Sequence, residues 1–209
     1  NATSWLRQFV VIASVGALLL VSAGLLAQEI ALRSRPVLGW LTLLPLLAVI
    51  RILPARTAGA CGAFWGASLF VFLALQSQPL IALSLTSLAS LVGMPAAYAT
   101  GMVLVSRRVG FNPLVLAFGW CGVELALLPL GLPGGLLGGI VGGSSGLLGV
   151  LQGVLGYVCI AALVVTVNAI AVSVLSRAYA KVCASQRVVR KSTLTRCSRF
   201  VPRESPIGW

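Results

Sequence analysis

The sequence predicts an all-α membrane protein, a polytopic transmembrane helical bundle of about six helices. Of its 209 residues, 59% are hydrophobic and 9% are charged, and the mean hydropathy is +1.06. A soluble domain carries about a quarter charged residues, so this chain has too little polar surface to cover a water-soluble globule. Lipid is therefore the expected solvent for most of it. The apolar runs show no strand-like alternation, which favours helices that satisfy their own backbone groups.

Charged residues and prolines divide the chain into apolar segments. A helix rises about 1.5 Å per residue, so about 20 residues cross a hydrocarbon core of about 30 Å. The second segment is short and contains Pro45, so we expect it to kink or to cross only partly. The six segments are residues 9–32, 37–53, 57–75, 79–106, 113–132 and 147–175. The expected domains are an N-terminal segment at 1–8, a transmembrane helical domain at 9–176 and a basic, mostly extended tail at 177–209.

The cations predict the orientation of the chain in the membrane. There are 15 Lys and Arg residues against 3 acids. If the N-terminus with Arg7 is cytoplasmic, thirteen of the fifteen cations fall on that side, and only Arg33 and Arg35 fall opposite. This agrees with the positive-inside rule, so we expect the N-terminus and the C-terminal tail in the cytoplasm. The same distribution favours membrane topology over nucleic-acid binding as the reason for the net charge of +12.

Eight of the cations lie in the tail, which begins at Arg177. Its first turns can extend the last helix into water, and the part with Pro202 and Pro206 is expected to be extended or ordered by a partner. Each cation near a membrane surface contributes about 1 kcal/mol of attraction to anionic headgroups. Two alternatives have equal weight: the tail docks to lipid or to a partner subunit, or it is solvated and has no dedicated partner. The docking candidates are Arg177, Lys181, Arg187, Arg190, Lys191, Arg196, Arg199 and Arg203.

Three polar residues of the apolar segments are candidates for structural or functional roles. Glu124 lies midway along the fifth segment, where an ionised carboxylate costs several kcal/mol unless it is paired. A structural hydrogen bond is the simpler interpretation of this acid, and a functional site is the other. Asn168 in the sixth segment is a candidate for a hydrogen bond between helices. Glu29 precedes Arg33 by four residues, which favours an interfacial acid with a helical partner.

Glycines at four-residue spacing predict close helix packing. Lipid supplies no hydrophobic drive between helices, so their association depends on small residues that let backbones approach. A substrate channel lined by backbone is the alternative. The glycines concerned are Gly62, Gly66, Gly138, Gly142, Gly146, Gly149 and Gly153.

The short motifs give no support for catalysis or a bound metal. Residues 142–146 (GGSSG) match the GxSxG pattern of serine hydrolases, but that site needs a histidine base, and the chain has no histidine. For the same reason no haem, chlorophyll or metal is expected through histidine ligation. The five cysteines include no CxxC pair, so neither a zinc site nor a disulfide framework is indicated. Bound lipids are the expected small molecules.

Several stretches together resemble the membrane domain of bacterial apolipoprotein N-acyltransferases. The run "GWLTLLPLLAVIRILPARTAGACGAFWGASLF" (39–70) looks like the family's second and third helices. The run "GWCGVELALLPLGLP" (119–133) is similar to its W-x3-E-x-x-R helix and the GFPW loop that follows, with Trp120 and Glu124 matching the Trp and the Glu. Leu127 stands in place of the family's arginine and Gly134 in place of its tryptophan. The run from 151 to 177 resembles the next helix.

The resemblance implies a similar membrane bundle but not the family's reaction. These residues include no counterpart of the family's nitrilase-like domain with its Glu-Lys-Cys triad, so we expect no enzyme activity. We expect a non-catalytic accessory subunit of a larger membrane complex, respiratory or photosynthetic, in a bacterial cytoplasmic membrane or one derived from it. The alternatives are the membrane half of a split lipoprotein N-acyltransferase that binds lipid or lipoprotein, and a small transporter that uses Glu124 and breaks at Pro45, Pro95 and Pro129.

Overall fold

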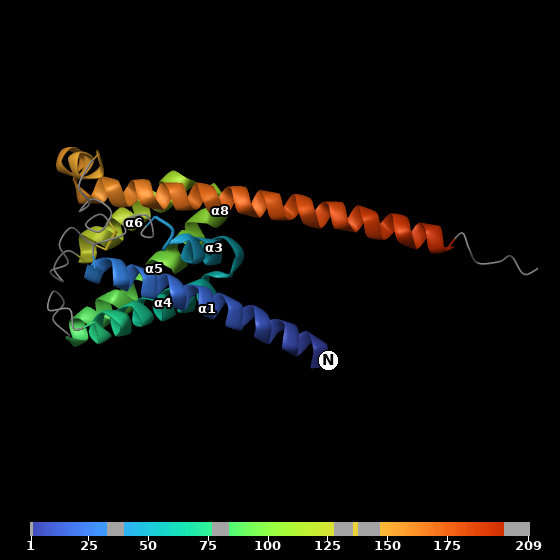
Figure 1. The fold of residues 1–209 in the computed structure, drawn as a ribbon, viewed down its shortest axis with the longest axis horizontal. Coiled ribbons are helices and arrows are strands. Elements are labelled where there is room, and N and C mark those ends of the chain that lie inside the picture. Colours follow the sequence, from blue (N-terminus) through green and yellow to red (C-terminus); the bar gives the residue numbers. More distant parts are fainter. Residues whose placement is uncertain (1, 33–39, 77–83, 128–135, 138–146, 199–209) are drawn as a thin grey trace, which may run out of the picture. The chain divides into compact units, whose positions relative to one another are not determined.

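The described part of the structure consists almost entirely of helices, as the sequence predicts (Figure 1). This computed structural model describes residues 2–32, 40–76, 84–127, 136–137 and 147–198, and the side chains of 9–30, 40–76, 84–127, 136–137 and 156–181. No strand occurs in these ranges. The helices are α1 (Ala2–Leu32), α3 (Leu44–Ile52), α4 (Ala55–Leu75), α5 (Leu85–Val109), α6 (Pro113–Leu127) and α8 (Leu147–Ser198). The chain divides into two compact units, Asn1–Val172 and Ser173–Trp209.

Within the described residues, four helical segments are long and apolar enough to cross a membrane. They are Phe9–Ile30 within α1, Ala55–Leu75 (α4), Leu85–Val109 (α5) and Gly156–Lys181 within α8. Helix α6 is also apolar but shorter, at 15 residues. The chain therefore has the helices of an integral membrane protein. Its orientation, and the membrane in which it resides, stay predictions.

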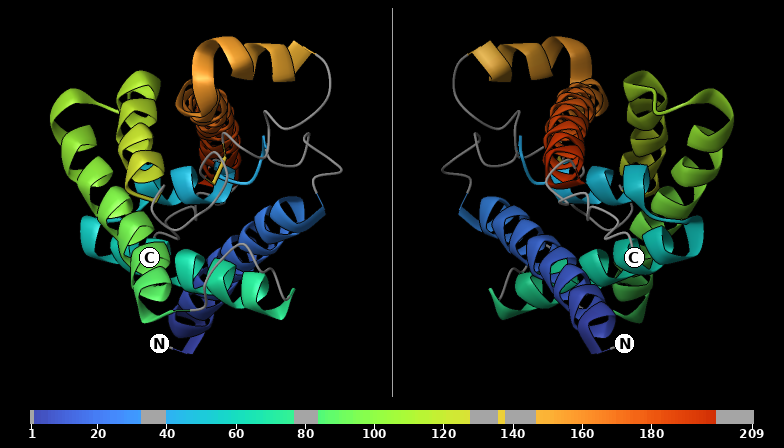
Figure 2. Two further views of the ribbon diagram at one scale, coloured as in Figure 1. Left: turned by 90° about the vertical axis from the view of Figure 1, so that its left-hand side faces the viewer. Right: turned by 90° about the vertical axis from the view of Figure 1, so that its right-hand side faces the viewer.

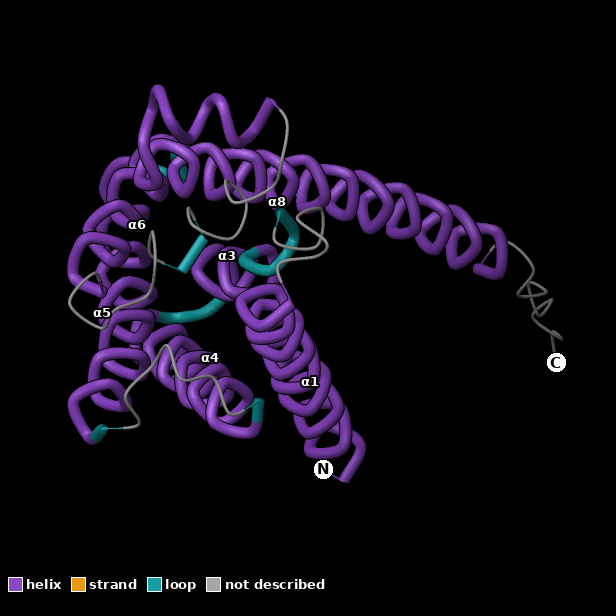
Figure 3. Tube along the Cα trace, turned by 60° about the vertical axis from the view of Figure 1, so that its left-hand side comes forward, coloured by secondary structure: helices purple, strands orange, loops and turns teal. Residues whose placement is uncertain are grey.

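Helix α3 corresponds to the short second segment of the sequence and contacts α1, α4 and α5 (Figure 3). Its 9 residues rise about 14 Å, so the helix by itself covers about half of a hydrocarbon core. Pro45 lies in its first turn, where a missing N–H breaks no helical hydrogen bond. The proline therefore begins this helix and does not kink it. Pro54 immediately precedes α4. A proline disfavours helical geometry in the residue before it, here Leu53, so α3 ends at Ile52.

Local polar groups and a glycine set the ends of α5 and α6. Ser84 Oγ accepts a hydrogen bond from the Ser87 amide at 3.1 Å and caps the start of α5. The helix stops at Gly110, whose φ of 82° is accessible to glycine at little cost. Asn112 Oδ1 accepts a hydrogen bond from the Leu114 amide at 2.9 Å at the start of α6. The turn between the two helices is thus specified by its own sequence.

Several predicted boundaries differ from the structure. Helix α3 begins at Leu44 and not at 37, and α5 spans Leu85–Val109 and not 79–106. Helix α1 begins at Ala2, so the expected separate segment 1–8 is largely helical. Helix α6 ends at Leu127, five residues before the predicted boundary at 132, and Pro129 follows closely. The predicted continuous segment 147–175 is interrupted at Gly156, which has φ 76° and ψ 166°.

In the second unit, helix α8 continues to Ser198, which corrects the expectation of a mostly extended tail over residues 177–198. No glycine or proline occurs between residues 157 and 201. Ten of the 22 residues from 177 to 198 are Ala, Arg, Lys or Gln, which have high helix propensity. Without a helix breaker, little opposes continuation of the helix into water. Residues 199–209, with Pro202 and Pro206, lie outside the described part.

Among the described helix pairs, α4 and α5 pack most extensively (Figure 2). A Cβ at Gly66 would lie 1.9 Å from the Leu91 carbonyl oxygen, and one at Gly62 would lie 2.5 Å from the Pro95 carbonyl oxygen. Pro95 has no N–H to donate, so the Leu91 carbonyl lacks its usual helical partner. The Cα–H groups of a neighbouring helix are weak donors for such a carbonyl. The proline in α5 and the glycines in α4 therefore belong to one contact.

The interior of the first unit is built around two tryptophans, whereas one face of α1 is apolar and open. Trp65 and Trp120 are fully buried among aliphatic side chains. Phe9, Val11 and Ile12 of α1 are each more than half exposed. An exposed apolar face on a membrane helix contacts lipid or another membrane subunit.

Candidate functional site

Glu124 is the acid with the most defined environment in the described part of the chain. It is 2% exposed on α6. Its Oε1 accepts hydrogen bonds from Trp120 Nε1 at 2.9 Å and from the Leu137 amide at 2.8 Å. Its Oε2 accepts one from the Leu136 amide at 2.7 Å. Three N–H donors, two of them from the backbone, therefore compensate the carboxylate, and no cation among the described residues does so.

The Glu124 contacts hold a turn of the chain inside the bundle. Leu136 and Leu137 form this turn, and both side chains are fully buried. Backbone outside a helix is tolerated at membrane depth only when its polar groups find partners within the protein. The carboxylate supplies those partners. The residues on either side of the turn, 128–135 and 138–146, lie outside the described part.

An aromatic cluster extends from Trp120 towards the other helices. The Trp120 ring meets the Tyr98 ring edge to face at a centroid distance of 5.1 Å and an interplanar angle of 86°. It meets the Trp65 ring at 6.3 Å and 75°. Both arrangements are the favourable geometry for aromatic quadrupoles. The Tyr98 hydroxyl donates to the Leu116 carbonyl at 3.0 Å, so α4, α5 and α6 meet at this cluster.

Ser22 continues the network to α1. Trp65 Nε1 donates a hydrogen bond to Ser22 Oγ at 2.9 Å, and the Ser22 hydroxyl donates to the Thr42 carbonyl. All three residues are buried. One hydroxyl therefore joins α1, α4 and the turn that precedes α3.

Asn168 makes a separate connection in the same unit. Its Nδ2 donates to the Val164 carbonyl on its own helix, at 2.8 Å, and to the Trp40 carbonyl. Its buried Oδ1 has no hydrogen-bond partner among the described residues. The contact to Trp40 joins α8 to the segment before α3. A hydrogen bond between separate segments is the contact expected for Asn168. Asn168 does not contact Glu124.

Glu29 and the predicted docking cations have fewer described contacts. Glu29 is 4% exposed on α1, so it lies inside the bundle rather than open at an interface, and Arg33 lies outside the described residues. Arg177 and Lys181 are both exposed in the second unit. The side chains of Arg187, Arg190, Lys191, Arg196, Arg199 and Arg203 lie outside the described part.

The predicted packing glycines are also only partly described. Gly62 and Gly66 lie in the contact between α4 and α5, together with Gly59, whose Cβ would lie 2.3 Å from Thr100 Oγ1. The remaining glycines, or their surroundings, fall outside the described residues: Gly138, Gly142, Gly146, Gly149 and Gly153.

The sequence predictions missed the partners of Glu124 and the Ser22 connection. The hydrogen bond between Trp120 and Glu124 was predictable, since the N–H of a buried tryptophan requires an acceptor. Trp120 and Glu124 are four residues apart and therefore adjacent on one helix face. No comparable rule links Trp65 to Ser22 or Glu124 to Leu136, because those partners are distant in sequence.

The arrangement is suited to holding helices together. Within the described ranges, no group of three His, Cys, Asp or Glu side chains lies close enough to hold a metal ion. The buried donors and acceptors that are described bond mainly to backbone and indole groups. Comparison with protein-family models, with curated proteins and with solved structures returned no match to this chain.

Proposed function

We propose that this chain is a non-catalytic accessory subunit of a larger membrane complex, of respiratory or photosynthetic type, and that its bundle is related to the membrane domain of apolipoprotein N-acyltransferases. The observation that carries the proposal is the use of Glu124. Its two oxygens accept three hydrogen bonds from the protein itself, and they anchor a backbone turn. The acid thus has a structural task.

Catalysis or coupled transport would require Glu124 to be accessible to substrate or water. A general acid or base must reach its substrate, and a transport carboxylate must exchange its ion or proton with water. Glu124 is 2% exposed, and release of its donors would leave two backbone N–H groups unsatisfied. This cost favours the structural role over the transporter alternative.

The exposed apolar side chains offer surfaces for partner subunits. Ile12 on α1, Leu75 on α4 and Phe118 on α6 are each more than 70% exposed. Side chains of this kind are compatible with lipid and with a neighbouring membrane helix. The proposal requires at least one of these surfaces to contact a protein in the native membrane.

Site-specific photo-crosslinking tests the proposal. A photoreactive amino acid is placed singly at Ile12, Leu75 or Phe118 in the full chain, in its native membrane, and at fully buried Leu69 as the matched control. The expected result is a discrete crosslinked protein from one exposed position and none from Leu69. Crosslinks to lipid alone from all three positions, with a monomer in mild detergent, would contradict the accessory-subunit role.

A second candidate is the membrane half of a split lipoprotein N-acyltransferase. It is favoured by one observation: Trp120 and Glu124, which carry the resemblance to that family, are directly hydrogen-bonded. This candidate requires a separate nitrilase-type subunit. Co-purification of such a subunit, and acyl transfer to a lipoprotein only when both chains are present, would support it. Lack of transfer by the combined subunits would exclude it.

A further inference from the structure

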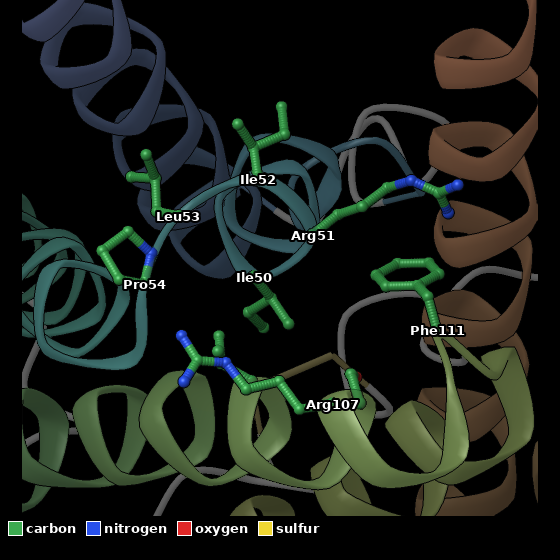
Figure 4. Close-up of a pocket in the computed structure, with 9 residues that line it drawn as sticks. Ile50, Arg51, Ile52, Leu53, Pro54, Arg107 and Phe111 are labelled. Atoms are coloured by element: carbon green, nitrogen blue, oxygen red, sulfur yellow. The ribbon is translucent and has the colours of Figure 1, made fainter.

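A pocket of about 450 Å³ lies where α3 and α5 end, beside the proline that precedes α4 (Figure 4). This volume is within the range of binding pockets. Its lining combines apolar side chains, among them Ile50, Val103 and Phe111, with the polar residues Ser106 and Arg107. The pocket therefore offers both an apolar wall and a charged group to a ligand.

Four arginines give this end of the first unit a basic surface. They are Arg51 in the last turn of α3, Arg56 in the first turn of α4, and Arg107 and Arg108 in the last turn of α5. No acid lines the pocket, and the two acids among the described residues, Glu29 and Glu124, are buried on other helices. The surface therefore attracts acidic partners and disfavours basic ones.

Arg107 is the arginine of the pocket that is available to a partner. Its exposed side chain extends towards Pro54 (Figure 4), and no hydrogen bond or ion pair joins it to another described residue. Arg51 extends the other way, and its Cζ atom lies 4.8 Å from the centroid of the Phe111 ring. Arg51 and Phe111 thus form one wall of the pocket, and Arg107 supplies the guanidinium that binds an anion.

A carboxylate beside an apolar side chain fits this arrangement. One guanidinium presents its N–H groups as a planar fork, which matches the two oxygens of a single carboxylate. Helix α5 has 25 residues and rises about 38 Å, against about 30 Å for a hydrocarbon core. Its last turn, with Arg107 and Arg108, is therefore expected outside the hydrocarbon, where an extramembrane segment of another protein reaches the pocket.

We propose that the pocket docks an acidic segment of a partner membrane subunit. A carboxylate of that segment pairs with Arg107, and a neighbouring apolar side chain packs against Ile50, Val103 and Phe111. The arginines that flank the pocket add long-range attraction. This inference rests on the proposed role as an accessory subunit, and it adds where the partner binds and what chemistry the partner presents.

Photo-crosslinking from inside the pocket tests the proposal. A small diazirine amino acid replaces Ser106, which lines the pocket, in the full chain in its native membrane. The matched control is Leu104, which is exposed on α5 but does not line the pocket. We expect the Ser106 probe to crosslink one protein, through a peptide that contains Asp or Glu when it is identified by mass spectrometry. The Leu104 probe should not reach that peptide.

Charge variants in the Ser106 background measure the share of Arg107. Arg107→Gln should lower the crosslinked fraction about tenfold, because a hydrogen bond to a charged group contributes about that factor. Arg107→Lys should keep part of the yield. Arg108→Gln, outside the pocket lining, should lower the yield by no more than about twofold. Salt at about 1 M should also lower the yield, since it screens exposed charges.

A charge exchange identifies the ion pair itself. Arg107→Glu should abolish the crosslink, because it places a carboxylate opposite the acid of the partner. Replacement of that acid by Lys, once its peptide is identified, should restore the crosslink in the Arg107→Glu chain. Lack of restoration by every acid of the peptide would overturn the pairing.

Two further results would overturn the docking site and leave the accessory role intact. One is a crosslink to lipid alone from Ser106 while Ile12, Leu75 or Phe118 crosslinks to a protein. The other is a Ser106 crosslink that neither Arg107→Gln nor salt reduces. Absence of any protein crosslink from all four positions would contradict the proposed function as well. If an Arg107 variant fails to fold, the salt dependence and the acid content of the crosslinked peptide still decide.

Discussion

Trp120 and Glu124 lie one turn apart on α6 and share a hydrogen bond of 2.9 Å from the indole Nε1 to the carboxylate Oε1. Both side chains are buried, and the same carboxylate accepts the amides of Leu136 and Leu137. The pair therefore links a helix, an aromatic cluster and a backbone turn. An acid in an apolar helix has a structural explanation here, because the turn needs acceptors that lipid does not provide.

Glu124→Gln should destabilise the protein although it removes the cost of burying a charge. The glutamine amide keeps one oxygen, and its NH2 group faces a donor where the second oxygen stood. At least one of three N–H groups then lacks an acceptor, at a cost of about 1–3 kcal/mol. The melting temperature in detergent, measured with and without the substitution, gives the effect. An unchanged melting temperature would contradict the anchoring role.

Trp120→Phe tests how far the indole and the carboxylate act together. The variant loses one donor to Glu124 and part of the ring that meets Tyr98 and Trp65. We expect a loss of stability of about 1–3 kcal/mol. The losses of Trp120→Phe and Glu124→Gln should not add in the double variant, since residues in one network couple by about 0.5–3 kcal/mol. If the two stability losses add exactly, the hydrogen bond between Trp120 and Glu124 contributes nothing to stability.

The sequence was sufficient for the class of fold because composition and segment length depend on each residue's own chemistry. It also placed Pro45 in a short segment and Glu124 midway along an apolar one. The expectation of an extended segment over 177–198 is wrong, because no glycine or proline interrupts the helix between Gly156 and Pro202. The anchoring of Leu136 by Glu124 was not predictable, since it depends on where an irregular segment returns to the bundle.

Gly66→Ala should loosen the contact of α4 with α5. The new Cβ would lie 1.9 Å from the Leu91 carbonyl oxygen, and backbone cannot yield as a flexible side chain does. Overpacking of this kind costs about 1–3 kcal/mol. Gly93→Ala is the control on α5, because its Cβ would meet nothing within 4 Å, and it should be neutral or stabilising by up to about 1 kcal/mol. Thermal unfolding of the two variants side by side measures the difference, and equal effects would refute the close contact.

Ser22→Ala should cost more than the loss of one small hydroxyl suggests. Removal of Ser22 Oγ leaves the Trp65 indole N–H without its acceptor and the Thr42 carbonyl without this donor, both inside the bundle. A buried indole N–H that has lost its acceptor costs about 1–3 kcal/mol. Ser14→Ala is the matched control on α1, since its hydroxyl is exposed and bonds only to the Val10 carbonyl of its own helix, at 2.8 Å.

We expect Ser14→Ala to change the free energy of unfolding by no more than about 0.5 kcal/mol. Trp65→Phe should reproduce much of the Ser22→Ala loss, and the double variant should be little worse than either single one, because both remove the same bond. Unfolding in detergent, followed by loss of the monodisperse species on size exclusion, measures all four variants. A Ser22→Ala variant as stable as Ser14→Ala would mean that the link between α1 and α4 depends on apolar packing alone.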